Sequence, residues 1–286
     1  MQAIKKYSKL VKFEHTLFAL PFAMIGFFLA VTGNESKLSL KLLVLVLLSM
    51  VFARNAAMGF NRFLDRKIDK INPRTAKREI PSGEIKSKHA LLFVIINSVL
   101  FIVTTWFINH LCFYLSPVAL FVILFYSYTK RFTALCHFVL SLSLAIAPVG
   151  AYLAVTGVFD WVPIYIGSIV FFWVSGFDII YALQDEEFDK ENELKSVPSY
   201  IGKRKALNLS VILHILSATC VIIVGILAHR GWLHWTGAVI FIFLLGYQHS
   251  LVKPNDLRKV NLAFFTTNGI ASVIYGIFVI GDLLIN

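Results

Sequence analysis

The strongest constraint on this fold is the repetition of apolar runs of about 20 residues, the length that a helix needs to cross a bilayer. Charged residues make up only 15% of the chain, against about 25% in an average soluble domain. We therefore predict an all-α integral membrane protein with nine transmembrane helices. The predicted spans are residues 16–33, 41–61, 89–108, 111–128, 134–156, 162–184, 206–228, 232–252 and 260–284.

The distribution of basic residues predicts the orientation of these spans. The chain has 27 Lys and Arg residues, and the connections on one predicted side hold nearly all of them. The other side keeps only Lys37, Lys41 and Arg230, and Arg54 lies within a span. Because cytoplasmic loops are enriched in Lys and Arg, we predict a cytoplasmic N-terminus and no cleavable signal. The net charge of +11 follows this topology, so nucleic-acid binding is not expected.

Two polar stripes lie at the predicted cytoplasmic ends of spans two and six, and each precedes a long polar loop. A helix turns about 100° per residue, so steps of three or four return to one face. The first stripe contains Asn61, Asp65 and Asp69. The second contains Asp178, Tyr181, Asp185 and Asp189. Because the two stripes lie four spans apart at equivalent helix ends, they also suggest an internal repeat of four plus four helices with one extra helix. We predict a single domain over residues 1–286.

These stripes predict a magnesium–diphosphate site. Ionisable residues at membrane depth are costly and are functional candidates, and like charges four residues apart destabilise a helix unless a cation compensates. Magnesium favours one or two carboxylates together with phosphate oxygens and water. The alternative is that these aspartates only end helices among the lipid headgroups. Nearby cations suited to phosphate oxygens are Arg62, Arg66, Lys67, Arg74 and Arg78.

The two motifs resemble the two signatures of the UbiA superfamily of intramembrane prenyltransferases. The first is Asn61-x3-Asp65-x3-Asp69 followed by Arg74-Thr-x2-Arg78-x2-Pro-Ser-Gly, and the second is Asp178-x2-Tyr181-x3-Asp185-x3-Asp189. The segment Tyr-Ser-Tyr-Thr-Lys130-Arg131 and the residue Arg54 are similar to the 4-hydroxybenzoate branch. The resemblance extends over nearly the whole chain.

This resemblance implies nine helices around a central cavity in a bacterial plasma membrane, with the active site facing the cytoplasm. It implies Mg²⁺-dependent transfer of a polyprenyl group from its diphosphate to an aromatic acid, in quinone biosynthesis, with the isoprenoid tail held among the apolar spans. Asn61, Asp65 and Asp69 would bind one half of the magnesium–diphosphate, and Asp185 and Asp189 the other. Lys130, Arg74 and Arg78 would contact the diphosphate, and either Arg131 or Arg54 would pair with the carboxylate of the acceptor. Asp178 and Tyr181 would orient the acceptor or take its proton.

The acceptor stays open at this stage. The 4-hydroxybenzoate branch usually has Asp after the first Asn, whereas Arg62 follows Asn61 here. The alternative acceptor is 1,4-dihydroxy-6-naphthoate of the futalosine menaquinone route. A haem or chlorophyll acceptor has no support in the sequence. A transporter is disfavoured because its ion sites would lie near the bilayer centre, and an inactive scaffold is disfavoured because both motifs are complete.

Four further polar positions carry structural expectations. Gln184 lies off the face of the second stripe and is expected to contact the stripe residues without binding the ligand itself. Asn261 and Asn268 are seven residues apart, which predicts one shared face and hydrogen bonds between helices. Glu14 and His15 open the first span and are expected at the membrane interface.

Overall fold

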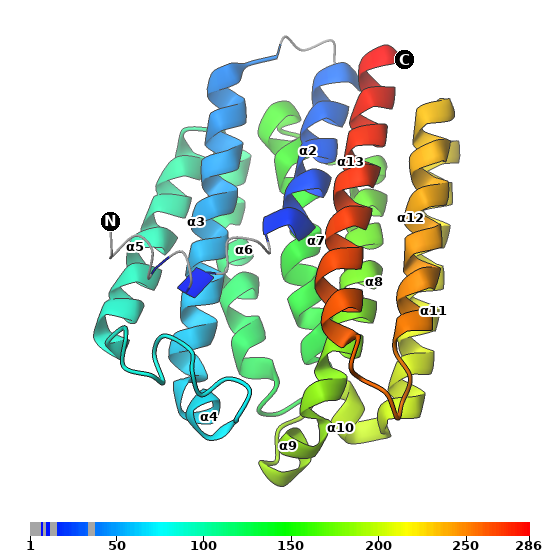
Figure 1. Cartoon of the computed structure of the whole chain (residues 1–286). Coiled ribbons are helices and arrows are strands. Elements are labelled where there is room, and N and C mark those ends of the chain that lie inside the picture. Colours follow the sequence, from blue (N-terminus) through cyan, green and yellow to red (C-terminus); the bar gives the residue numbers. More distant parts are fainter. Residues whose placement is uncertain (1–6, 8–9, 12–15, 34–37) are drawn as a thin grey trace. The chain divides into compact units, whose positions relative to one another are not determined.

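The computed structural model describes residues 7, 10–11, 16–33 and 38–286, which form helices and contain no β-strand. Its long helices are α2 (Thr16–Gly33), α3 (Leu40–Leu64), α5 (Ser87–Trp106), α6 (His110–Thr129), α7 (Cys136–Thr156), α8 (Trp161–Ala182), α11 (Lys203–Leu227), α12 (Trp232–Leu251) and α13 (Asn268–Ile285) (Figure 1). The short elements are α4 (Arg66–Ile71), the 3₁₀-helix η2 (Leu183–Asp185), α9 (Glu186–Glu191), α10 (Val197–Ile201) and the π-helix η3 (Leu262–Thr267). Glu14 and His15 lie outside the described residues.

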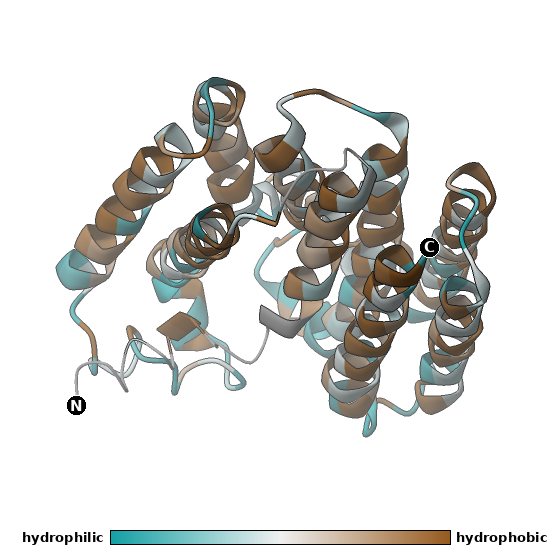
Figure 2. Cartoon of the chain, turned by 90° about the horizontal axis from the view of Figure 1, so that it is seen from above, coloured by the Kyte–Doolittle hydropathy of each residue, from teal (hydrophilic) through white to brown (hydrophobic). Residues whose placement is uncertain are grey.

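Each of the first eight predicted spans coincides with one helix, and the ninth covers η3 and α13 together; each predicted end lies within three residues of an end of these elements. Within the described part of the chain, seven helices are long and apolar enough to cross a membrane, and hydrophobic residues cover most of the long helices (Figure 2). The apolar part of α2 is shorter, and α12 is made less hydropathic by His234, Gln248 and His249. The prediction of an all-α membrane protein is confirmed.

The chain divides into two compact units, and the first contains residues up to Thr16 and Leu40–Tyr128. Its helix α3 packs along α5, where Asn55 Nδ2 donates a hydrogen bond to Asn97 Oδ1 over 3.0 Å. A small buried cluster joins the loop that follows α4 to these two helices. Its members are Leu10, Ile80, Ile85 and Ala90, with Tyr7, Phe63 and Phe93 packed against them. The loop after the first motif is therefore held by apolar contacts as well as by its polar groups.

The second unit contains Leu17–Ser39 and Thr129–Asn286. Helix α8 packs against both α7 and α11, and α12 packs against α13. The core is an aromatic cluster built around Trp173 of α8, which contacts Phe22 of α2 and Phe241 of α12. In a bilayer no water is displaced when helices associate, so their stability depends on close packing. Large buried rings contribute much of that packing. The second motif therefore extends from the most enclosed helix of this unit.

A π-helix changes the register of the last span, and this makes one sequence prediction wrong. Asn268 is buried as predicted: its Oδ1 accepts a hydrogen bond from Trp173 Nε1 over 2.7 Å, and its Nδ2 donates to Gln248 Oε1 over 3.2 Å. Asn261 is exposed instead of sharing that face. A π-helix has more residues per turn than an α-helix, so the seven-residue spacing no longer returns to the same side.

We predict that replacing Gly26 with alanine will destabilise the second unit. A Cβ atom at this position of α2 would collide with the backbone carbonyl of Pro148 in α7, and a backbone neighbour cannot rotate away. Overpacking of this kind costs about 1–3 kcal/mol, which a lower melting temperature in detergent would report. The matched control is Gly150→Ala on α7, where a Cβ meets nothing within 4 Å. Equal melting temperatures for the two variants would contradict the close helix contact.

Candidate active site

The first motif lies where α3 passes into α4, and the helix is interrupted there. The prediction of one continuous helical face is therefore corrected: α3 ends at Leu64, Asp65 has φ −84° and ψ 3°, and α4 starts at Arg66. The backbone bonds still follow the helical spacing, from Asp65 N to Asn61 O (2.9 Å) and from Asp69 N to Asp65 O (2.7 Å). Asn61 Nδ2 also donates to Asp65 Oδ2 over 3.0 Å. These bonds keep the three motif residues together despite the interruption.

Asp69 is the most enclosed member of the first motif. Its carboxylate is buried, and Arg78 Nη1 donates a 2.7 Å hydrogen bond to Oδ1. The hydroxyl of Thr75 donates to the Asp69 backbone oxygen over 3.1 Å, which folds the loop back onto α4. The second carboxylate oxygen, Oδ2, is also buried and has no hydrogen-bond partner among the described residues. Leaving a buried carboxylate oxygen unsatisfied is costly, so this atom is a candidate ligand for a cation.

The second motif repeats this arrangement. Helix α8 ends at Ala182, η2 carries the chain to Asp185, and α9 starts at Glu186. Asp189 is fully buried, and Lys130 Nζ lies 2.7 Å from its Oδ1. Neither Oδ1 nor Oδ2 accepts a hydrogen bond of good geometry from the described residues, although the side chain of Ser196 also interacts with this carboxylate. Asp185 is buried as well.

The two motifs therefore share one local construction. In each, an aspartate stands just before a six-residue helix whose fourth residue is a buried aspartate. In each, one cation contacts Oδ1 of the buried carboxylate, Arg78 in the first unit and Lys130 in the second. The similarity extends to the aspartates before the helices, since Asp65 and Asp185 have nearly the same φ and ψ values. Four-residue spacing predicted the aspartates, whereas the cations that pair with them could not be chosen from several basic neighbours.

Helix α7 fixes the loop that follows the second motif. The backbone N–H of Lys195 donates to Lys130 O over 2.7 Å, and Cys136 Sγ donates to Lys195 O over 3.4 Å. The side chain of Ser196 then caps α10 in a capping box with Ser199. Lys130 is thereby tied to the motif by its main chain as well as by its ammonium group. This arrangement restricts the position of the cation that contacts Asp189.

His137 is a residue of this site that sequence reasoning missed. Its Nδ1 lies 2.6 Å from Asp178 Oδ2, while the backbone N–H of Val197 donates to its Nε2 over 3.2 Å. Because Nε2 accepts a hydrogen bond, the proton of a neutral ring is on Nδ1 and is donated to the carboxylate. The sequence could have revealed His137 by its place in an apolar predicted span, because ionisable residues at membrane depth are functional candidates.

The structure places the other predicted residues at different depths. Tyr181 stacks on Phe264 of the π-helix with ring centroids 4.1 Å apart, a partner that the sequence did not suggest. Gln184 Nε2 donates to the Tyr181 backbone oxygen over 3.2 Å, consistent with a supporting role. Three arginines were also predicted: Arg54 is half-buried on α3, Arg131 is half-buried beside Lys130, and Arg74 is exposed in the loop after α4. Arg62, the departure in the first motif, is buried.

The residues of each motif suit a magnesium ion that also binds phosphate. Within the described residues, no group of three or more His, Cys, Asp or Glu side chains is arranged to hold a metal. Magnesium does not need such a group, because it is usually bound by one or two carboxylates plus substrate phosphates and water. The unsatisfied Oδ2 atoms of Asp69 and Asp189 are hard oxygen ligands of the kind that it prefers. The donor set therefore fits the metal.

Comparisons with known proteins agree with this chemistry. A model of the UbiA prenyltransferase family matches residues 19–270. A 4-hydroxybenzoate octaprenyltransferase of Vibrio campbellii is 27% identical, over 94% of this chain and 95% of that protein. A solved UbiA homologue from Aeropyrum pernix K1 has a TM-score of 0.84 and 27% identity, covering 94% of this chain and 98% of its own. A homologue from Archaeoglobus fulgidus, bound to GPP and Mg²⁺, has a TM-score of 0.73 and 25% identity, covering 98% and 100%.

Proposed function

The chain belongs to the UbiA prenyltransferase family, and we propose that it transfers a polyprenyl group from polyprenyl diphosphate to the ring of a 4-hydroxybenzoate-type acid. The observation that carries this proposal is the repeated aspartate construction. In both Asp69 and Asp189 the buried Oδ2 accepts no hydrogen bond of good geometry from the described residues, and a cation suited to phosphate lies at Oδ1. The names of the octaprenyltransferase relative and of the GPP-bound homologue support the same reaction.

In this proposal the two motifs hold the diphosphate. Asn61, Asp65 and Asp69 bind one half of the magnesium–diphosphate, and Asp185 and Asp189 bind the other. Bound Mg²⁺ would draw negative charge from the departing diphosphate and so weaken the allylic C–O bond. Arg78 and Lys130 each contact the buried aspartate of one motif, and in this proposal each also contacts phosphate oxygens when the diphosphate binds. Arg74, exposed in the loop after α4, contacts the diphosphate from its outer side.

The acceptor is handled by the residues one to two turns before Asp185. Asp178, whose Oδ2 lies 2.6 Å from His137 Nδ1, accepts the proton that leaves the substituted ring. The aromatic pair Tyr181 and Phe264 stabilises the developing allylic cation by cation–π contact through a ring face that their mutual stacking leaves uncovered. Either Arg131 or Arg54 pairs with the acceptor carboxylate. The isoprenoid tail lies among the apolar helices and enters from the surrounding lipid.

The same proposal includes nine spans with a cytoplasmic N-terminus, in a bacterial plasma membrane. Helix α12 belongs among the spans because its polar groups His234 and Gln248 are buried, whereas Val239 and Phe243 are exposed. An outward apolar face and inward polar groups are what a membrane-spanning helix requires. The matching construction of the two motifs supports an internal repeat within one domain. The concentration of Lys and Arg in the loops after both motifs supports an active site on the cytoplasmic side.

We predict that His137 acts by positioning Asp178. His137→Ala removes the N–H donor, and we expect kcat to fall about tenfold, which is less than the roughly 10²–10⁴-fold that a general acid or base itself contributes, because Asp178 remains in place. His137→Asn puts an amide N–H near the place of Nδ1 and is expected to recover most of the rate. The two variants are compared by kcat and by the pH profile of the reaction. If both variants lost activity equally without any change in that profile, His137 would have only a structural role.

A parallel assay tests the acceptor. Purified protein, magnesium and a labelled polyprenyl diphosphate are offered 4-hydroxybenzoate or 1,4-dihydroxy-6-naphthoate, and prenylated products are identified by mass spectrometry. We expect product from 4-hydroxybenzoate, as in ubiquinone synthesis. Product from the naphthoate alone would move the enzyme to the futalosine menaquinone route. The absence of any magnesium-dependent reaction by folded protein would overturn the proposed function.

A further inference from the structure

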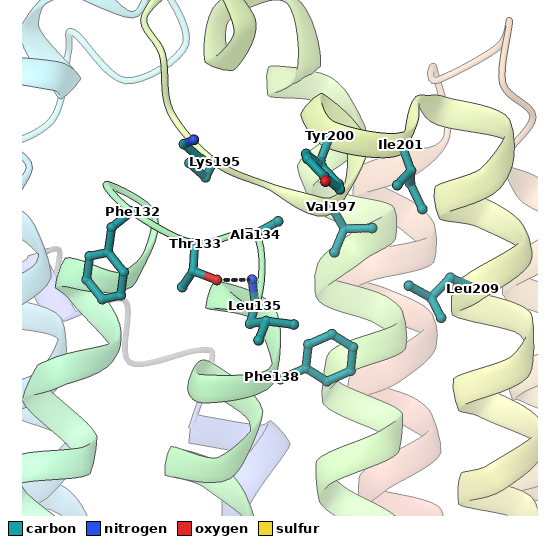
Figure 3. Close-up of a pocket in the computed structure, with 10 residues that line it drawn as sticks. All are labelled: Phe132, Thr133, Ala134, Leu135, Phe138, Lys195, Val197, Tyr200, Ile201 and Leu209. Carbon is teal, nitrogen blue, oxygen red and sulfur yellow. Dashed lines mark hydrogen bonds between the residues drawn. The ribbon is translucent and has the colours of Figure 1, made fainter.

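The second unit has a surface hollow that the proposed reaction does not use. It has a volume of about 410 Å³ and lies between the segment before α7, helix α10 and the start of α11. Phe132, Leu135 and Phe138 form one side of it, and Tyr200 and Leu209 form the other, with Lys195 at its edge (Figure 3). Apolar side chains therefore make up most of the wall, and Lys195 is the one charged residue in its lining.

The hollow lies at the ends of membrane-spanning helices. Helix α7 begins at Cys136 and α11 at Lys203, and both are long and apolar enough to cross a bilayer. Three residues around it are strongly exposed, Phe132 (56%), Leu135 (58%) and Tyr200 (80%). Aromatic side chains are enriched at this level, where acyl chains meet headgroups. The exposed apolar wall is therefore suited to contact with lipid.

The charges beside the hollow favour an anion. Within the described chain, the Lys195 ammonium group makes no ion pair with a carboxylate, and Arg204 and Lys205 are exposed in the first turn of α11. That turn contains no acidic residue, and Gly202 supplies no side-chain cap. Positive side chains oppose the positive end of the helix dipole, whereas an anion there is stabilising. Lys203 of this turn already lies near Glu186 and Glu187, so the charges left to an added anion are those of Lys195, Arg204 and Lys205.

We propose that this hollow binds one anionic phospholipid of the adjacent leaflet. The acyl chain lies against Phe138 and Leu209, and the phosphate lies between Lys195 and the first turn of α11. Basic pockets between membrane helices bind anionic headgroups in this way. Because Lys195 is bonded through its backbone to Lys130, and Lys130 contacts Asp189, the bound lipid would rest against the loop of the second motif.

Native mass spectrometry of the detergent-purified protein tests this proposal, with phosphatidylglycerol and phosphatidylcholine offered in equal amounts. We expect one phosphatidylglycerol to be retained in preference. Lys195→Gln and Arg204→Gln should each weaken its binding about fivefold, the contribution of one basic residue near an anionic surface. The matched control is Lys253→Gln, an exposed lysine in another loop of the same unit, which should change binding less than twofold.

Filling the hollow separates a lipid from a small anion. Leu209→Trp should remove the retained lipid, and Ala134→Phe fills the same space if the first variant does not fold. Glycerol 3-phosphate, which has the headgroup charge without acyl chains, should bind at least tenfold more weakly than the lipid. Equal retention of both lipids, equal binding of glycerol 3-phosphate, or an equal effect of Lys253→Gln would overturn the proposal.

Discussion

Replacing Asp189 with asparagine is expected to lower the rate of prenyl transfer by at least about 10³-fold while the protein stays folded. The substitution keeps the volume of the side chain and removes its charge. The buried Oδ2, which we assign to the magnesium–diphosphate, is lost as an anionic ligand. Lys130 loses its partner, but its side chain is about one-third exposed and can be solvated. The rate with saturating magnesium, and the magnesium concentration at half-maximal rate, are the measurements.

A matched control comes from the same six-residue helix. Glu187 belongs to α9 as Asp189 does, but its side chain is 86% exposed, so Glu187→Gln should leave the rate within about twofold, as expected of a weak surface ion pair. Asp69→Asn in the first unit should reproduce the loss seen with Asp189→Asn, because both aspartates have the same construction. A near-normal rate for folded, monodisperse Asp189→Asn would show that this carboxylate does not bind the metal.

The sequence predicted the long helices well because their signal is local. Each apolar run is long enough to span a bilayer, and no other structure satisfies its backbone in lipid. The short helices α4 and α9 were not predicted as separate elements, because the stripes treated Asp69 and Asp189 as continuing the faces of the preceding spans. Six residues, most of them charged, carry little periodicity, and such short helices are stable only through tertiary contacts. The break at Asp65 was missed for a related reason, since the four-residue spacing of the aspartates continues through it.

The candidate site was predictable in its acidic residues and not in their partners. Asp69 and Asp189 follow from spacing and from the resemblance to a family, which the family match confirms. Their cations do not, because Arg78 was one of several basic residues near Asp69, and Lys130 is distant in sequence from Asp189. The contact of His137 with Asp178 also joins two helices. Such pairs depend on tertiary packing, which a single sequence does not display.

Replacing Lys130 with methionine should destabilise the protein more than Asp189→Asn does, because the group left behind is a fully buried carboxylate. Removing one partner of a buried ion pair costs about 3 kcal/mol. We expect a clear fall in melting temperature, measured with EDTA so that no metal compensates. The pair Lys190–Glu186 on the same helix supplies the control. Glu186 is buried, but Lys203 Nζ also lies 3.5 Å from its Oε2, so removing the exposed Lys190 leaves it a cationic partner and Lys190→Met should cost less than about 1 kcal/mol.

The double variant Lys130→Met/Asp189→Asn separates stability from catalysis. The buried carboxylate and its partner charge are both gone, so most of the lost stability should return, as happens when such a pair is replaced by neutral groups. Prenyl transfer should stay abolished, because both the carboxylate assigned to the metal and the cation assigned to the diphosphate are absent. Recovery of activity together with stability would mean that the pair only holds α9 in place, and the diphosphate site would then have to be assigned to other residues of the second motif.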